Sequence, residues 1–164
     1  MSTTAFPSYS NQVTMQHKAY VYAGPSKSQY GDSIGYIDPG DTVYIHWKYG
    51  EWYFVEYPIS GGWKTGYVLK TEFNDVSGLN TNSIGVMPQS NQGYRYVNTT
   101  TNIYYGYRDP LAWAGVVAYR SERVYYTGVK YNGYALITWP AHDLNVDAYG
   151  WIYAQKLSVS PVSE

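Results

Sequence analysis

Three histidines are the residues of this 164-residue sequence best suited to acid–base or metal chemistry, and their spacing supports neither. His17, His46 and His142 are widely separated, and no H-x-H or H-E-x-x-H pattern pairs two of them. His46 lies between Ile45 and Trp47 in a segment typical of a strand, so we interpret it as a surface or groove histidine. The sequence contains no cysteine, which excludes disulfides, thiolate metal ligands and a cysteine nucleophile.

Other catalytic patterns are also missing from the sequence. The G-x-S-x-G motif of a nucleophile elbow is absent. The chain does contain Ser, His and Asp, so its composition does not exclude a Ser-His-Asp triad. The twelve acidic residues are scattered, whereas sugar hydrolysis needs two carboxyl groups across a cleft, and we expect Glu51, Glu56 and Glu72 to be solvated. Residues 143–147 (DLNVD) open like a calcium loop, but Ala148 replaces the turn glycine. We therefore expect no catalytic residue, no metal ion and no cofactor.

Aromatic side chains are the remaining candidates for a functional role, as ligand-contacting groups. The chain has 22 tyrosines and six tryptophans but only three phenylalanines, so most of its rings carry a hydroxyl or indole group that can meet water. This mixture suits contact with sugars and peptides. The alternative is that tyrosine fills the half-buried faces of a small β-protein.

Charge and hydropathy narrow the classes of partner. Eleven Lys and Arg against twelve Asp and Glu give a net charge of −1 with no basic run, which disfavours nucleic-acid binding. No apolar run approaches the roughly 20 residues needed to cross a bilayer, so we expect no membrane contact. The first residues lack the pattern of a signal peptide. Either a signal precedes this chain in a longer protein or the parent protein is exported by other means.

The elements that must position these side chains fall into two similar halves. We expect a polar arm over residues 1–17, a first module over 18–74, a linker over 75–93 and a second module over 94–160. Matched segments follow in the same order, with offsets of 80 to 84 residues: VYAG (21–24) with IYYG (103–106), IGYI (34–37) with AGVV (114–117), VYI (43–45) with VYY (124–126), YGEWYFVEYP (49–58) with YNGYALITWP (131–140), and GYV (66–68) with GWI (150–152).

Strand signals dominate both halves. The matched segments are short, β-branched and aromatic, and Gly, Asp, Asn and Pro separate them. Residues 38–41 (DPGD) predict a turn, and Asn132-Gly133 is a strong hairpin signal. We see no long helix, and we predict an all-β chain of two small β-barrels in tandem. Each half is near the lower size limit for independent folding, so packing of the two halves against each other would help both.

The first half resembles the bacterial SH3 (SH3b) family. It carries AGPS (23–26), IGYI (34–37), GDTV (40–43), WYFV (52–55) and GYV (66–68) in the family's order. The second half departs from the pattern: YRDP follows Gly106, Arg120-Ser121 replaces Gly-Asp, and Tyr134 stands where the family has Trp. In the first half, Tyr22 stands at a position where members of the family often have Arg.

This resemblance implies SH3-like barrels that attach a lytic enzyme to the bacterial cell wall, outside the cell. The implied ligand is peptidoglycan, and its peptide stem or cross-bridge is favoured over its glycan as the part that is bound. The resemblance also implies that the parent protein carries a covalently linked catalytic domain. A structural or protein-interaction module is the alternative, and a small hydrolase of unfamiliar design is a second one.

The implied groove lies between the long loop after the first strand and the hairpin ends. Along WYFVEY, alternation places Tyr53, Val55 and Tyr57 on one face and Trp52 with Phe54 on the other. Trp52 therefore either faces the groove or covers the barrel end. We predict these ligand-binding residues, five in each half: Tyr22, Tyr30, Trp47, Trp52, Tyr67, Tyr104, Tyr107, Trp113, Tyr134 and Trp151.

Overall fold

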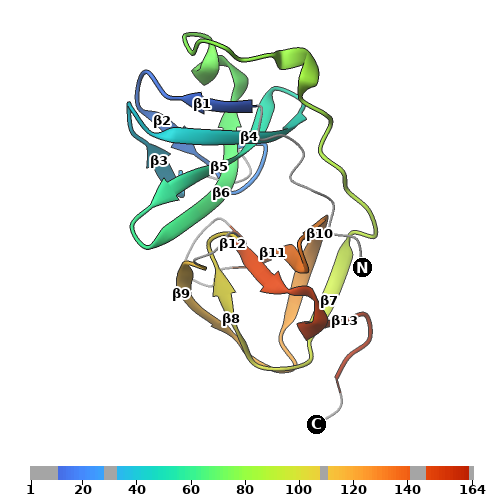
Figure 1. Cartoon of the computed structure of the whole chain (residues 1–164). Helices are drawn as coiled ribbons and strands as arrows, with labels where there is room; N and C mark the ends of the chain where they lie inside the picture. The colour runs from blue at the N-terminus through green and yellow to red at the C-terminus, as the bar shows by residue number, and fades with distance from the viewer. Residues whose placement is uncertain (1–10, 28–32, 108–110, 141–146, 163–164) are drawn as a thin grey trace.

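The computed structural model describes residues 11–27, 33–107, 111–140 and 147–162, and it is built from strands (Figure 1). Three short 3-10 turns lie wholly within this part of the chain: η2 (Lys70–Phe73), η3 (Thr81–Ser83) and η4 (Ala154–Lys156). The prediction of an all-β chain is therefore confirmed.

The first unit holds a four-stranded antiparallel sheet in the order β1-β4-β5-β6 and a separate β2-β3 pair. Its strands are β1 (Gln12–Thr14), β2 (Ala19–Val21), β3 (Gly35–Ile37), β4 (Thr42–Tyr49), β5 (Trp52–Ile59) and β6 (Gly62–Leu69). An isolated bridge between Tyr22 and Tyr67 connects the end of β2 to β6.

The second unit is one seven-stranded sheet in the order β13-β7-β10-β11-β12-β8-β9. Its strands are β7 (Gly93–Val97), β8 (Thr101–Tyr104), β9 (Trp113–Ala118), β10 (Arg123–Tyr131), β11 (Tyr134–Pro140), β12 (Asp147–Tyr153) and β13 (Leu157–Ser158). In Figure 1 this unit lies below the first one.

The two units share one order of strand pairing. β1-β4-β5-β6 corresponds to β7-β10-β11-β12, and the β2-β3 pair corresponds to β8-β9. Trp151 pairs with Tyr104 just as Tyr67 pairs with Tyr22, and both long hairpins contain a register shift in their first strand. The internal repeat read from the sequence is therefore a repeat of structure.

A glycine at the same place in each unit explains part of the repeat. A Cβ on Gly66 would clash with Val21 Cγ1, and a Cβ on Gly150 would clash with Ile103 Cγ2. Only glycine lets β6 approach β2, and β12 approach β8, this closely. The first residue of the GYV and GWI segments therefore serves packing.

The predicted turns form where the sequence placed them. Asn132 and Gly133 have φ of 53° and 83°, which fits a tight hairpin turn with two left-handed residues between β10 and β11. Gly40 in DPGD has φ of 92°, a value that glycine adopts without strain.

Each unit has its own apolar core. Val21, Ile37, Val55 and Tyr57 belong to the first, and Ile103, Ile137 and Ile152 belong to the second. Tyr53, Val55 and Tyr57 enter the first core together, which confirms the face assigned to them by alternation.

The expected arm and linker are more ordered than their polar composition suggested. Val13 and Met15 are buried in the first core, and β1 pairs with β4, so the last part of the predicted arm over residues 1–17 belongs to the first unit. The connection over residues 75–93 runs along one side of the molecule (Figure 1). Its Ile84 enters the first core, and its Met87 enters a cluster between the units.

The sheets remain open in the part of the chain that the structure describes. The first unit keeps two separate sheets joined by the Tyr22–Tyr67 bridge, and the second keeps one sheet with β13 and β9 at its edges. The prediction of two small all-β units therefore holds at this level. The described sheets do not close into the barrels that were predicted.

Candidate ligand-binding surface

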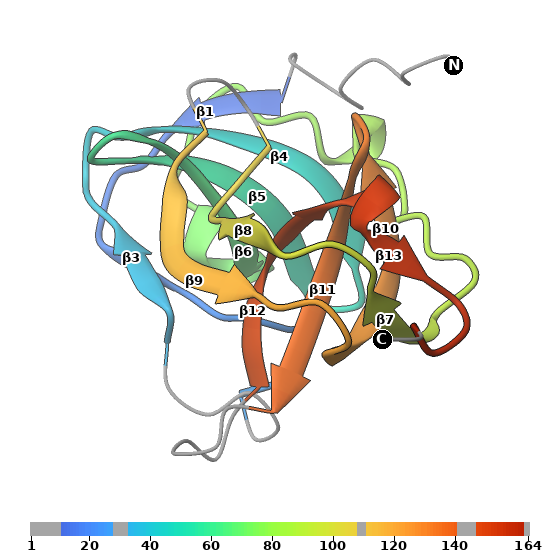
Figure 2. The same cartoon turned by 90° about the horizontal axis from the view of Figure 1, so that it is seen from below.

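A large aromatic cluster joins the two units and determines which rings stay accessible. Figure 2 shows the second unit in front of the first. We call it the junction cluster; its buried members are Trp47, Trp52, Phe54, Tyr67, Met87, Tyr107, Val129, Tyr131, Leu136 and Trp151.

The junction cluster brings matching faces of the two repeats together. Trp47, Phe54 and Tyr67 come from the first unit, and the residues at the corresponding places in the second are Val129, Leu136 and Trp151. Phe54 meets Trp151 edge to face at a ring distance of 6.2 Å. Each unit thus covers the outer face of the other, and the expectation that the two halves pack together is confirmed.

A polar contact fixes how the two faces meet. The Trp151 indole N–H donates to Thr65 Oγ1 at 2.6 Å, and the Tyr149 hydroxyl also contacts this oxygen. The Thr65 backbone N–H donates to the Tyr105 carbonyl at 3.2 Å. Burial raises the pKa of Tyr149 well above its usual value, so this phenol stays protonated. A buried threonine of the first unit therefore anchors three residues of the second.

The junction cluster also contains half of the predicted ligand-binding residues. Trp47, Trp52, Tyr67, Tyr107 and Trp151 are buried, and Trp151 has no exposed surface. Trp52 lies on the face opposite Val55, as alternation predicted, but that face is covered by protein instead of forming an open groove. These five rings serve the contact between units because the second unit occupies the face where a ligand was expected.

The remaining predicted residues lie outside this buried set. Tyr22 and Tyr134 are half-buried at the edge of the junction cluster, Tyr104 is half-buried, and the side chain of Trp113 is 54% exposed. Tyr30, the fifth of them, lies outside the described residues.

Accessible rings gather on one strip of the second unit. Tyr104 and Tyr134 contact each other at a ring distance of 6.3 Å, and Tyr134 contacts the exposed Tyr153 at 5.4 Å. Trp113 stands opposite Tyr104 on the neighbouring strand β9, and its indole N–H donates to the Val116 carbonyl. We call these four residues the aromatic strip. It crosses β9, β8, β12 and β11 and includes three of the predicted residues.

The first unit has a smaller counterpart at the same place in the fold. Tyr22 meets Trp52 edge to face at 5.6 Å, as Tyr104 meets Tyr134, and Leu69 pairs with Trp52 where Tyr153 pairs with Tyr134. Trp52 is buried here and Leu69 replaces a ring, so less aromatic surface remains. The second unit is therefore the better candidate for ligand contact.

Two pairs of exposed rings were not predicted from the sequence. Tyr20 and Tyr36 pair across β2 and β3, with the Lys18 ammonium 4.0 Å from the Tyr36 ring centre. Tyr94 and Tyr125 pair across β7 and β10. Outward tyrosines in alternation with buried residues were the available signal, but tyrosine is so frequent here that it singled out neither pair.

The buried histidine corrects two expectations. His46, expected at the surface or in a groove, has no exposed surface, and its Nε2 lies 2.9 Å from Oε1 of Glu56, which is equally buried although expected to be solvated. A register shift in β4 between Ile45 and Trp47 places this histidine beside the junction cluster, and its ring lies 6.5 Å from that of Tyr107. The pair is enclosed by both units, so solvent does not reach it.

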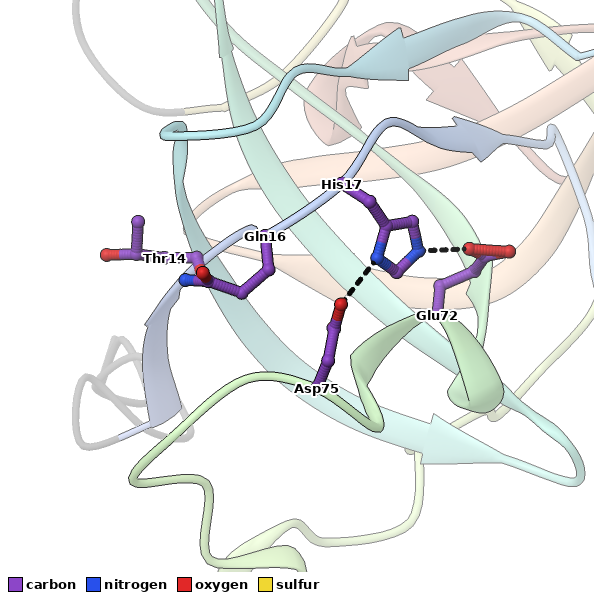
Figure 3. Close-up of polar contacts among 5 residues, drawn as sticks. All are labelled: Thr14, Gln16, His17, Glu72 and Asp75. Carbon is purple, nitrogen blue, oxygen red and sulfur yellow. Dashed lines mark hydrogen bonds and ion pairs between the residues drawn. The ribbon is translucent and has the colours of Figure 1, made fainter.

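His17 lies between two carboxylates at the surface (Figure 3). Its Nε2 is 2.8 Å from Glu72 Oε2, and its Nδ1 is 2.8 Å from Asp75 Oδ2. The hydrogen bond to Glu72 and then that to Asp75 raise the pKa of His17 above its usual 6.5. Because both ring nitrogens are held, the histidine is arranged to tie β1–β2 to η2 and not to accept a proton from a substrate.

This arrangement predicts a pH-dependent contribution to stability. A raised pKa in the folded state means that the stabilisation by His17 is complete below pH 6.5 and is lost as the pH rises through the folded-state pKa. The melting temperature of the wild type should therefore exceed that of a His17→Gln variant at pH 6, and the difference should shrink by pH 9. Scanning calorimetry across this range checks the trend. An advantage that grows with pH would contradict it.

Metal and membrane features are limited in the part of the chain that the structure describes. No three His, Asp or Glu side chains there converge to hold a metal ion, and the loop at 143–147 lies almost entirely outside it. Likewise, the described residues include no helix long and apolar enough for a bilayer.

Neither protein-family models nor curated proteins give a match to this chain. Function must therefore be argued from the repeat, the junction cluster and the aromatic strip.

Proposed function

We propose that this chain is a pair of SH3-like (SH3b) units that binds bacterial peptidoglycan without cleaving it. The order of the SH3b-like segments supports this, as does the repetition of one strand-pairing order in both units. The chain would act outside the cell, at the wall, as the targeting part of a longer lytic protein whose catalytic domain does the cutting.

The observation that carries the proposal is the aromatic strip. Its four aromatic residues occupy paired positions on neighbouring strands, and two of them, Trp113 and Tyr153, are exposed. Rings with hydroxyl and indole groups can stack on apolar parts of a ligand while their polar ends meet water. An open strip suits an extended peptide lying across the strands, which favours the peptide stem or cross-bridge over the glycan.

Substitutions on the strip test wall binding directly. A Trp113→Ala, Tyr153→Ala double variant should bind purified sacculi about tenfold or more weakly, because exposed aromatic anchors commonly contribute 1.4 kcal/mol or more. Co-sedimentation over a range of sacculus concentrations measures the affinity. The matched control is Tyr94→Ala, which removes an equally exposed ring on β7. Equal binding by the double variant and the wild type would contradict a role for the strip.

The ligand is tested by changing the wall. We expect binding to walls stripped of teichoic acid to persist, and binding to glycan strands freed of peptide to be lost. Binding to the peptide-free glycan alone would overturn the preference for peptide.

One observation favours the alternative of a structural or protein-interaction module. Five of the ten predicted rings hold the two units together, so the abundance of aromatics is partly explained without a ligand. A spacer of this kind would remain in the supernatant when sacculi are sedimented.

A further inference from the structure

A small pocket opens in the second unit beside β9, the edge strand of its sheet. The pocket holds about 210 Å³ of empty space, part of which is open to solvent. Its lining is aliphatic except for one acidic residue and consists of Ile103, Val116, Val117, Ala118, Glu122, Val124 and Ile137. The pocket therefore offers room for a small apolar group next to a glutamate.

Comparison of the two repeats explains why this space exists. The pair Ala19–Ile37 across β2 and β3 corresponds to the pair Thr101–Ala118 across β8 and β9. Ile37 is fully buried in the first core, whereas Ala118 places only a methyl group at the equivalent position of the second. The second unit thus lacks the carbons beyond Cβ that the isoleucine supplies in the first. A short aliphatic group is the occupant that would replace them.

A second exchange between the repeats acts in the same direction. The Met15 backbone N–H donates to the Asp41 carbonyl at 3.0 Å, and the Val97 backbone N–H donates to the Glu122 carbonyl at 2.9 Å. Met15 and Val97 are therefore equivalent, as are Asp41 and Glu122. Valine is shorter than methionine, so the second unit has less side chain with which to fill its core near Glu122.

Glu122 supplies a negative charge at this pocket. Its Oε1 accepts a hydrogen bond from the Tyr119 N–H at 2.7 Å, which holds the side chain in the turn before β10. Alternation places the neighbouring Arg123 on the opposite face, where its guanidinium carbon lies 4.3 Å from the centre of the Tyr94 ring. An acidic residue beside an aliphatic pocket favours a ligand that carries a cation next to its apolar group.

We propose that this pocket binds the free amino end of a peptide that begins with a small aliphatic residue. The side chain would fill the space beside Ala118, and the α-ammonium would pair with the Glu122 carboxylate. A lysine side chain fits less well, because its ammonium is at the tip and would enter the apolar end of the pocket. The source of the amino end rests on the proposed function: a wall cross-bridge that has not been linked ends in a free amino group.

Titration of the full ¹⁵N-labelled chain with isobutylammonium tests the pocket. Saturable shifts are expected at the backbone amides of Val117, Ala118, Glu122 and Val124. Isobutanol has the same shape without the charge and should bind about two- to fivefold more weakly, the range for an exposed ion pair. Methylammonium lacks the aliphatic part and should cause no saturable shift. Equal affinity for isobutanol, saturable shifts with methylammonium, or no shifts with isobutylammonium would overturn the proposal.

Variants separate the aliphatic contact from the charge. Ala118→Ile places the side chain of the first unit in the pocket and should abolish binding of isobutylammonium. Glu122→Gln keeps an acceptor for the Tyr119 N–H and should lower the affinity for isobutylammonium to that for isobutanol. The matched control is Glu51→Gln at an exposed carboxylate of the first unit, which should bind as the wild type does. If Ala118→Ile does not fold, the Glu122→Gln result decides. Unchanged affinity in either folded variant would overturn the site.

Acetylated sacculi test the source of the amino end. Treatment with acetic anhydride caps free amino groups, and it should weaken wild-type binding about twofold or more while leaving binding of the Ala118→Ile variant unchanged. No loss in the wild type, or an equal loss in both proteins, would overturn the wall peptide as the source.

The outcome is separable from that of the proposed function. Failure of isobutylammonium to bind, with intact sacculus binding, would remove only the pocket. Loss of sacculus binding with intact isobutylammonium binding would remove wall targeting and leave an amine site on a module of another role.

Discussion

Replacing Trp151 by alanine should lower the free energy of unfolding by about 3–5 kcal/mol, the range for large aromatic residues removed from a core. The side chain has no exposed surface and meets Phe54 at 6.2 Å and Tyr107 at 4.6 Å between ring centres. The substitution also removes the indole donor to Thr65, which leaves a buried hydroxyl with fewer partners.

The loss should affect both units, because Trp151 lies between them. In the wild type, the shared cluster predicts one cooperative unfolding transition by urea, with fluorescence and far-UV circular dichroism changing together. The matched control is Trp113→Ala, the same substitution at an exposed tryptophan, which we expect to cost less than about 1 kcal/mol. A Trp151→Ala cost no larger than that of Trp113→Ala would show that the junction cluster does not stabilise the protein.

Much of the fold could be predicted because its signals are local. Asn132-Gly133 and DPGD specify turns through backbone conformations that few residues adopt, and the alternation in WYFVEY correctly assigned Val55 to the core. The repeated order of segments located equivalent strands without any knowledge of their contacts. These features depend on neighbours along the chain, so the sequence contains them.

The use of each outer face depends on contacts between distant residues. Alternation places Trp52 and Phe54 on the second face of β5, but it does not tell whether water, a ligand or another unit covers that face. Here the matching face of the second unit covers it, and buried tryptophans replaced the expected groove. The aromatic strip stayed accessible because Tyr104, Trp113 and Tyr153 lie beyond this contact.

The burial of Glu56 likewise could not be predicted from the sequence. A single carboxyl group in a strand usually reaches water, which is why solvation was expected. Its partner His46 lies ten positions earlier on the neighbouring strand, and a register shift in β4 accompanies their meeting. Neither the shift nor the cover by the second unit has a sequence signal that would have revealed the pair.

The Glu56→Leu variant should therefore be destabilised by about 1–3 kcal/mol, the cost of leaving one partner of a buried hydrogen bond unsatisfied. The leucine fills similar volume, but the His46 Nε2 atom loses the oxygen 2.9 Å away in a site that water does not reach. Glu51→Leu at an exposed position of the same hairpin is the matched control and should change stability by less than about 0.5 kcal/mol.

The double variant His46→Phe, Glu56→Leu distinguishes a polar pair from simple packing. Replacing both partners by apolar groups removes the unmatched polar atom, so most of the stability lost in Glu56→Leu should return. Urea denaturation of the wild type, both single variants and the double variant yields the coupling energy of the pair. Costs that simply add would mean that the two side chains stabilise the protein independently, and the junction would then depend on its aromatic contacts and the Thr65 contact alone.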